Sequence, residues 1–292
     1  LFIATANTLD SIPRPLLDRM EVIQLAGYIA EEKLAIARKY LIPKSLTKAG
    51  LKRSQVRYQK SSLLAIANGY AREAGMRNYE KALDKIHRKI AKKIILDDIK
   101  KPMSMTPEML TDYLGQPIFS HEKLKAPQKP GMAVGLAWTN YGGDVLVIEA
   151  VNNPGTSGFK LTGQMGDVMQ ESANIAYTYV RHIAERHGVA PDFFECNSIH
   201  LHIPAGATPK DGPSAGITMA SALLSLSMDK SLKKNVAMTG ELSLSGSVHP
   251  IGGLKEKTIA ARRNGVKTLI IPAQNSKDLD EIPENIKKGI TF

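Results

Sequence analysis

Apolar residues recur at helical spacing in the first part of the chain, at positions i, i+3, i+4 and i+7 with charges between them. The stretches with this spacing are residues 30–40, 61–74 and 78–95. A fourth, short helix is predicted from Thr106, where Thr-Pro-Glu is typical of a helix start. Two apolar runs, residues 1–6 and 22–25, precede the helices and are predicted to be strands. This part of the chain is therefore predicted to be two short strands followed by a small helical domain.

The pattern becomes mixed after residue 131, where strand-like runs alternate with helical stretches. The predicted strands are residues 132–138, 144–151, 198–203, 236–244, 246–250 and 268–271. The predicted helices are residues 167–187, 212–228 and 254–264. This alternation predicts an α/β domain. The fold class of the whole chain is thus α/β, in a multi-domain α+β arrangement.

The periodicity stops between residues 115 and 131, where three prolines stand among lysines, a composition typical of a linker. Leu1 opens directly on an apolar run, without an initiator methionine or the regions of a signal peptide. Residues 289–292 resemble the start of another strand. We therefore expect the chain to be a piece of a longer protein.

Composition excludes a disordered chain and a membrane-spanning one. The 292 residues are 43% hydrophobic and 23% charged, which suffices for one large or two ordinary domains with their own cores. The longest uncharged stretch, residues 212–228, is shorter than the about 20 residues of a membrane span and carries five hydroxyl groups. The single cysteine, Cys196, cannot form an internal disulfide, which indicates a reducing compartment.

The net charge of +11 is concentrated in the first part of the chain. Residues 1–120 carry 21 Lys and Arg against 12 Asp and Glu, and the remainder carries 18 against 16. A basic helical surface can bind nucleic acid, an acidic substrate or nucleotide phosphates, although such a surface is more often only solvated. A nucleic-acid-binding module is thus one alternative for the function.

The segment Gly206-Ala-Thr-Pro-Lys-Asp-Gly-Pro-Ser-Ala-Gly216 is the strongest chemical signal. Asp211 or Gly212 can cap a helix with Pro213 in its first turn, because the N–H that proline lacks would be unpaired there anyway. Ser214 would then lie at a helix N-terminus, where free backbone N–H groups can stabilise an oxyanion. A capped helix start without any catalytic role is the alternative.

A nucleophilic serine needs a base, and histidine is the usual one. His200 and His202 alternate with apolar residues, so both imidazoles are expected on one face of a strand. A Ser-His hydrolase is therefore a second alternative. A metal site is not predicted, because no third ligand has supporting spacing, and hydrogen-bonded structural histidines would explain the pattern equally well.

Lysine is the other candidate base, and the helix predicted at residues 254–264 offers two. At 100° per residue, Lys257 lies beside the apolar stripe that includes Leu254, Thr258 and Ala261, whereas Lys255 points to the opposite side. A lysine directed inward loses hydration, which lowers its pKa and makes the neutral amine available. A lysine that snorkels from the edge of the stripe is the alternative.

Three segments closely resemble the active-site segments of the Lon family of ATP-dependent proteases. They are Pro209-Lys-Asp-Gly-Pro-Ser-Ala-Gly216, Met238-Thr-Gly-Glu241 and Pro250-Ile-Gly-Gly-Leu-Lys-Glu-Lys257. The resemblance implies a Ser-Lys dyad with Ser214 as nucleophile and Lys257 as general base. It also implies that Thr239 orients the lysine and that Asp211 shapes the site.

The first part of the chain resembles the end of the AAA+ module of the same family. Asn7 in Ala4-Thr-Ala-Asn7 resembles sensor 1, Arg19 resembles the arginine finger, and Arg77 resembles sensor 2 on the helical lid. Their chemistry suits phosphoryl transfer, which needs a positioned water and cations against developing charge. The sequence has no phosphate loop of the form Gly-x4-Gly-Lys-Ser/Thr. We therefore expect no ATP hydrolysis and no tight nucleotide binding by this chain alone.

The resemblance implies four segments, in chain order. They are the end of the AAA+ large subdomain (1–27), an all-helical lid (28–115), a linker (116–131) and a proteolytic domain shortened at its C-terminus (132–292). It further implies an ATP- and Mg²⁺-dependent homohexamer that degrades unfolded polypeptides, with DNA as an additional partner and no membrane. The implied compartment is the bacterial cytoplasm or, alternatively, the mitochondrial matrix.

Overall fold

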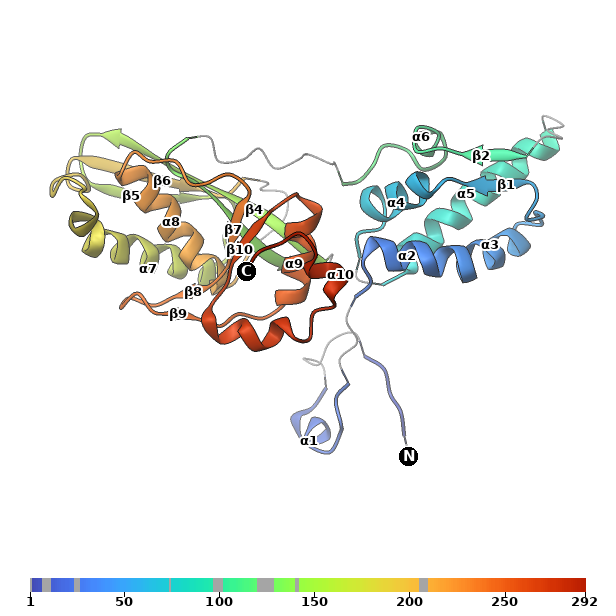
Figure 1. Cartoon of the computed structure of the whole chain (residues 1–292), viewed down its shortest axis with the longest axis horizontal. Helices are drawn as coiled ribbons and strands as arrows, with labels where there is room; N and C mark the ends of the chain where they lie inside the picture. Colours follow the sequence, from blue (N-terminus) through green and yellow to red (C-terminus); the bar gives the residue numbers. More distant parts are fainter. Residues whose placement is uncertain are drawn as a thin grey trace.

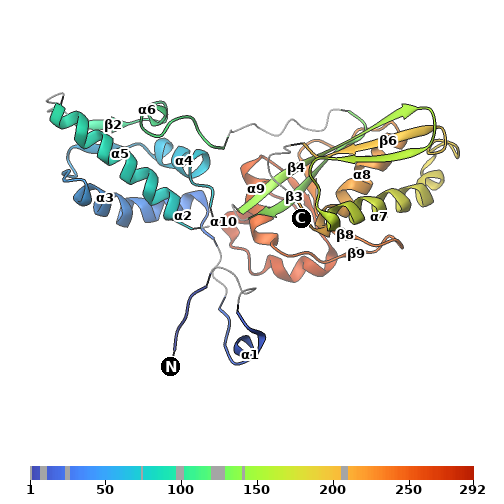
Figure 2. The ribbon, with the colours of Figure 1, turned by 180° about the vertical axis from the view of Figure 1, so that it is seen from behind.

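The computed structural model describes residues 2–6, 12–23, 27–73, 75–96, 102–119, 129–139, 142–204 and 210–292. Figures 1 and 2 show two bodies side by side, which we call the helical unit (27–119) and the α/β unit (129–292). The first residues form an arm that projects from the region between these units and carries the short helix α1 (Arg14–Leu17). The separation into a helical and an α/β part agrees with the change of periodicity along the sequence.

The helical unit is built from five α-helices, one π-helical turn and two short strands in the described residues. In chain order they are α2 (Ala30–Ile36), η1 (Ala37–Leu41), α3 (Ile42–Lys48), β1 (Val56–Tyr58), α4 (Lys60–Gly69), α5 (Arg77–Leu96), β2 (Met103–Met105) and α6 (Leu110–Leu114). Helical structure continues from α2 to Lys48, although the periodicity predicts an end near residue 40. Pro43 lies in the first turn of α3, directly after the π-helical turn, so its missing N–H falls where the hydrogen-bond register of the helix changes.

The parallel pair β1–β2 is a feature that helical periodicity does not predict. A polar network of side chains joins β1 to the helices α3 and α5. Tyr58 Oη lies 2.9 Å from His87 Nε2, His87 Nδ1 lies 2.7 Å from Ser45 Oγ, and the Ser45 hydroxyl donates to Asp84 (2.6 Å). Burial lowers the pKa of His87 to about 4, so the imidazole stays neutral at ordinary pH. The network fixes α3, α5 and β1 against one another, and its charged member, Asp84, is partly exposed and forms an ion pair with Lys48 (2.7 Å).

The α/β unit is a six-stranded mixed sheet in the order β10-β7-β3-β4-β6-β5. Its strands are β3 (Met132–Thr139), β4 (Gly142–Pro154), β5 (Gly158–Thr162), β6 (Asn197–His202), β7 (Val236–Met238) and β10 (Thr268–Ile270). Its longer helices are α7 (Asp167–Ile183), α8 (Gly216–Ser227) and α9 (Leu254–Arg263). The shorter elements are η2 (Ala184–His187), η3 (Pro213–Ala215), η4 (Ala273–Leu279), α10 (Glu284–Lys287) and the hairpin β8 (Glu241–Leu242) with β9 (Val248–His249).

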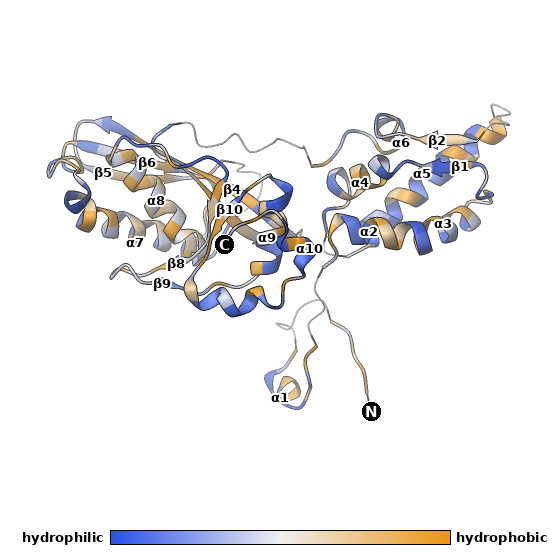
Figure 3. Ribbon diagram, viewed as in Figure 1, coloured by the Kyte–Doolittle hydropathy of each residue, from blue (hydrophilic) through white to orange (hydrophobic). Residues whose placement is uncertain are grey.

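The two faces of the sheet are covered by different helices. Ala133 packs with α7 and α8, whereas its neighbour Val134 packs with Ala260 and Ala261 of α9, because successive side chains of a strand point to opposite faces. Figure 3 shows hydrophobic colours gathered on the central strands, between these layers. The packing places the start of α8 and the start of α9 at the same part of the sheet, near the end of β7.

Several predicted strands differ from the structure. Residues 2–6 form no strand, and Phe2 and Ile3 are almost fully exposed. Of the run predicted at 22–25, residues 22 and 23 are not a strand, and the others lie outside the described residues. The strand predicted at 236–244 is divided into β7 and β8, and β5 is not predicted at all. A strand needs a neighbour to pair its backbone, and an apolar run alone does not reveal whether one is available.

Within the described ranges, no helix is both long and apolar enough to cross a membrane. The same residues contain no group of three or more His, Cys, Asp or Glu side chains arranged to hold a metal ion.

Candidate active site

Ser214 lies where the chain enters α8, as the sequence predicts. Residues 213–215 form the 3₁₀ turn η3, and α8 continues from Gly216. A side chain at Gly216 would collide with the Leu242 backbone nitrogen, 2.9 Å from a Cβ at that position, so a glycine is needed for α8 to approach β8. Ser214 is partly exposed, and its hydroxyl makes no hydrogen bond within the described part of the chain. It is therefore accessible to a substrate.

Lys257 lies on α9 and is buried, with only 2% of its surface exposed. This burial confirms the inward orientation predicted from the helical stripe, and Lys255 is partly exposed. Burial lowers the pKa of Lys257 from 10.5 to about 8, because desolvation disfavours the ammonium form. Near neutral pH, a useful fraction of the amine can therefore be unprotonated.

Thr239 connects the serine segment and the lysine. Lys257 Nζ donates to Thr239 Oγ1 at 3.1 Å, and the Thr239 hydroxyl donates to the Ser214 carbonyl oxygen, also at 3.1 Å. The Gly240 N–H donates to the same carbonyl at 2.8 Å. Because the single hydroxyl proton of Thr239 is used on Ser214, Thr239 can only accept from the lysine. The lone pair of a neutral Lys257 amine is thus not consumed by Thr239.

His200 and His202 are not brought to this site. Both rings contact Thr162 Oγ1, at 2.9 and 2.7 Å. Ile199 and Leu201, which alternate with the two histidines, are buried in the core that includes α7 and α8, so the imidazoles point to the opposite face of the sheet from α8. The structure therefore favours a structural role for the two histidines and lysine as the base.

Asp211 lies just before η3 and contacts the start of α7. Its Oδ1 accepts the N–H groups of Met169 (2.9 Å) and Gly212 (2.8 Å). Ser172 of α7 also reaches the serine segment, because its hydroxyl donates to the Pro213 carbonyl at 3.3 Å. No sequence pattern points to Ser172 or to the Gly240 N–H, because both contacts arise only when distant segments pack together.

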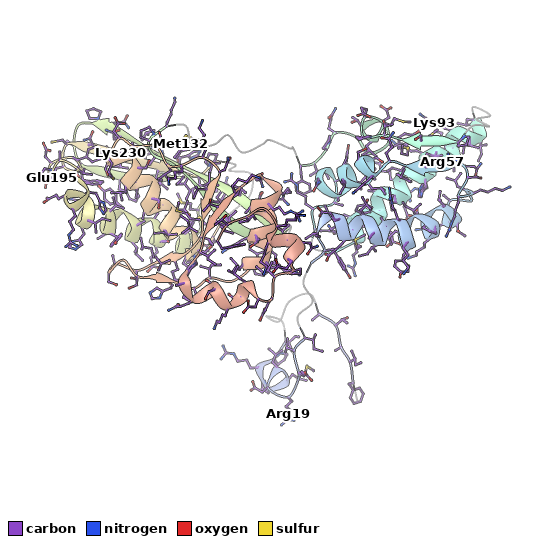
Figure 4. The ribbon with its side chains drawn as sticks, viewed as in Figure 1. Arg19, Arg57, Lys93, Met132, Glu195 and Lys230 are labelled. Atoms are coloured by element: carbon purple, nitrogen blue, oxygen red, sulfur yellow. The ribbon has the colours of Figure 1, made fainter. Side chains whose placement is uncertain are left out.

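The predicted ATPase residues are not gathered into one site in the described residues. Asn7 lies outside them. Arg19 follows α1 on the N-terminal arm, where Figure 4 shows it at the far end. Arg77 is the first residue of α5, and both arginines are exposed.

The α/β unit, in which a threonine joins a buried lysine to a serine at a helix start, and the small helical unit beside it match two known domain types, a proteolytic domain and an AAA+ lid. The chain belongs to the Lon protease family. The Lon protease (S16) C-terminal proteolytic domain matches residues 104–292, and the Lon protease AAA+ ATPase lid domain matches residues 47–103.

Bacterial Lon proteases are similar to the chain over nearly its whole length. The Lon protease of Borrelia duttonii is 58% identical over 293 residues, which is 100% of this chain and 36% of that protein. That of Treponema pallidum is 55% identical over 100% of this chain and 34% of that protein. That of Chlamydia muridarum is 51% identical over 99% of this chain and 36% of that protein. The chain thus spans about a third of the length of these relatives.

Proposed function

We propose that the intact protein to which this chain belongs is an ATP-dependent serine endopeptidase that degrades misfolded, damaged and regulatory proteins. Ser214 is the nucleophile, Lys257 is the general base, and Thr239 orients the lysine. The observation that carries this proposal is the buried Lys257 amine. It is hydrogen-bonded to Thr239, whose hydroxyl in turn donates a hydrogen bond to the backbone carbonyl of Ser214. The reaction is acyl transfer to the serine, followed by hydrolysis.

The neutral amine of Lys257 accepts the hydroxyl proton of Ser214 as the oxygen attacks the peptide carbonyl. Backbone N–H groups at the start of α8 stabilise the negative charge that develops on the carbonyl oxygen. The lysine, now an ammonium, returns the proton to the leaving amine. A water molecule then attacks the acyl-enzyme, with Lys257 again accepting a proton, and Ser214 is regenerated.

A serine-directed fluorophosphonate tests this assignment directly. We expect mass spectrometry to find the label on Ser214 alone, and we expect Lys257→Met to reduce the labelling rate at least about 100-fold. His200→Gln and His202→Gln should label normally, because neither ring faces the serine segment. Labelling of a different serine, or loss of labelling in the histidine variants only, would favour the Ser-His alternative.

We also propose an ATPase function for the intact protein, supported by its family and by the exposed arginines Arg19 and Arg77. ATP with Mg²⁺ supplies the energy to unfold and translocate polypeptides in a homohexamer. Arg19 acts as an arginine finger toward a neighbouring subunit, Arg77 acts as sensor 2, and Asn7 acts as sensor 1. We propose the bacterial cytoplasm as the compartment, since the relatives named above are bacterial, with the mitochondrial matrix as the alternative.

Nucleic-acid binding is a second candidate function, favoured by one face of α5. Arg77, Lys81, Arg88 and Lys92 are exposed and fall within about 60° of one another around the helix. No ion pair involves them in the described part of the chain. Such a face suits the phosphates of a nucleic acid.

For duplex DNA, we expect replacing both Lys81 and Lys92 by Ala to reduce the slope of log affinity against log salt by about 2, one for each lost phosphate contact. Lys230→Ala is the control, because Lys230 is an exposed lysine of the α/β unit, labelled in Figure 4. The measurement is fluorescence anisotropy over a salt series. No affinity above background at about 50 mM salt would remove this candidate.

A further inference from the structure

Helix α9, which carries Lys257, lies between the sheet and the helical unit. Ala260 and Ala261 pack with apolar residues of β3 and β7, whereas Ile259 and Arg262 line a cavity together with residues of α2 and α4. Figures 1 and 2 both show α9 and α10 on the side of the α/β unit that faces α2. At 100° per residue, the side chains of Lys257 and Ile259 point about 160° apart. The lysine and the contact with the helical unit are therefore on opposite sides of the same helix.

Ile29 extends from the helical unit into the α/β unit. It lies directly before α2, and only 4% of its surface is exposed. The other buried members of its apolar cluster are Leu254, Ile282 and Ile286, all from the α/β unit. The backbone of Ile29 is fixed by its own helix, because its N–H donates to Glu32 Oε2 at 3.0 Å. Ile29 is thus held by α2 and packs in one cluster with the first residue of α9.

A second contact between α2 and α9 is polar. Glu31 of α2 forms an ion pair with Arg262 in the last turn of α9, at 3.5 Å. Arg262 also donates to the Asn285 carbonyl at 2.6 Å. Glu31 is exposed and Arg262 is partly exposed, and an ion pair in such a position contributes little to stability. Of the two contacts, the apolar one at Ile29 is therefore the more important.

The first turn of α9 depends on this packing. Its N-cap, Gly253, has no side chain that could accept the free N–H groups of the helix start. The Lys257 N–H donates to the Gly253 carbonyl at 3.0 Å, so the lysine belongs to this first turn. Leu254, the first residue of the helix, is buried in the cluster with Ile29. Apolar packing at Leu254 therefore does for this turn what a capping side chain does for other helices.

We propose that Ile29 is a positioning residue of the peptidase, although it belongs to the helical unit: its packing with Leu254 fixes the first turn of α9 and thereby keeps the Lys257 amine buried beside Thr239. This inference deepens the proposed Ser-Lys peptidase and rests on it. A void in place of the Ile29 side chain lets the first turn move outward and admits water to the lysine. The burial of Lys257 then depends on a residue outside the α/β unit.

The test compares Ile29→Ala with Ile29→Leu in the intact protein, on a small fluorogenic peptide over a series of pH values. We expect Ile29→Ala to lower kcat at neutral pH about fivefold or more, because less of the Lys257 amine is neutral and correctly placed. The pH midpoint of kcat should rise from about 8 toward 10.5, because water around the amine favours the ammonium form. KM should stay unchanged, since Ile29 packs with α9 and α10 and not with the serine segment. Ile29→Leu, which conserves the side-chain volume, should keep at least half of kcat and the same pH midpoint.

Leu51→Ala is the matched control. Leu51 is also a buried aliphatic residue outside the helices, but it packs within the helical unit. Its replacement should leave kcat and the pH midpoint unchanged. If Ile29→Ala does not assemble, Ile29→Val, which removes only one methylene, should give a smaller rise of the midpoint in the same direction. The proposal is wrong if the midpoint stays unchanged in the Ile29 variant that assembles, or if it rises equally in Leu51→Ala.

Hydrogen exchange followed by mass spectrometry gives a measurement that does not depend on activity. Residues 254–260 should exchange faster in Ile29→Ala, but not in Ile29→Leu or Leu51→Ala. Unchanged exchange in Ile29→Ala would overturn the packing contact itself. If Ser214→Ala and Lys257→Met remain active, the proposed peptidase fails, whereas the exchange of residues 254–260 still decides whether Ile29 fixes the start of α9.

Discussion

Lys257→Met in the intact protein is expected to abolish peptidase activity while leaving the fold at least as stable as before. Methionine matches lysine in length but cannot accept the proton of Ser214, so the rate should fall by about three orders of magnitude or more. Lowering the pKa of Lys257 from 10.5 to about 8 corresponds to a cost of about 3 kcal/mol for holding the ammonium in its buried position. An apolar side chain at this site removes that cost.

The pH dependence has a defined sign. The neutral amine becomes the major form as pH rises through about 8, so kcat should increase with pH up to a plateau above that value. Between about 8 and 10.5 the unfolded state binds more protons than the folded state at this residue. The contribution of Lys257 to the free energy of unfolding should therefore rise with pH across this window, and Lys257→Met should lack that rise. Peptide hydrolysis and urea unfolding at a series of pH values measure the two effects.

Two further variants separate the proton acceptor from a fixed charge. Lys255→Met, on the same helix but partly exposed, should be nearly silent. Lys257→Arg should be inactive, because a guanidinium remains protonated at any working pH. If Lys257→Arg retained most of the activity, the lysine would act only as a charge, and the histidine alternative would become the better interpretation.

The helices were predictable because each has its own apolar stripe. Helix α5 spans Arg77–Leu96 against a prediction of 78–95, and α9 spans Leu254–Arg263 against 254–264. Strands were harder, because their pairing depends on distant residues. Strand β5 (Gly158–Thr162) is only five residues long, begins with a glycine and is followed by another, Gly163. It forms by pairing in parallel with β6, nearly forty residues later in the chain.

The two principal site residues were predictable by different means. The sequence around Ser214 indicates a helix start, and the stripe of α9 indicates that Lys257 points inward. That Thr239 lies between them follows from the family resemblance, since the residue is 25 positions from Ser214 and 18 from Lys257. No local pattern could show that Asp211 caps a helix beginning more than forty residues earlier. A weak signal does exist: α7 begins with a glycine that cannot cap it.

Arg19→Ala in the intact protein is expected to abolish ATP hydrolysis while leaving nucleotide affinity nearly unchanged. An arginine finger stabilises charge that develops in the transition state, so its loss lowers kcat by about 10³-fold or more without weakening ground-state binding. Arg19 is exposed at the far end of the N-terminal arm in Figure 4, away from the helical and α/β units of its own chain. This location suits a side chain that acts on a neighbouring subunit. Steady-state ATPase assays and nucleotide titrations measure the two quantities.

Arg14→Ala is the matched control, because Arg14 is an equally exposed arginine at the start of α1. It should retain ATP hydrolysis. A mixing experiment tests whether Arg19 acts between subunits. Subunits that carry Arg19→Ala, combined with subunits that cannot bind nucleotide, should regain part of the activity, since the second kind can offer an intact Arg19 to the first. If Arg19→Ala weakens nucleotide binding as much as hydrolysis, or if mixing restores nothing, Arg19 belongs to the fold or to the nucleotide site of its own subunit.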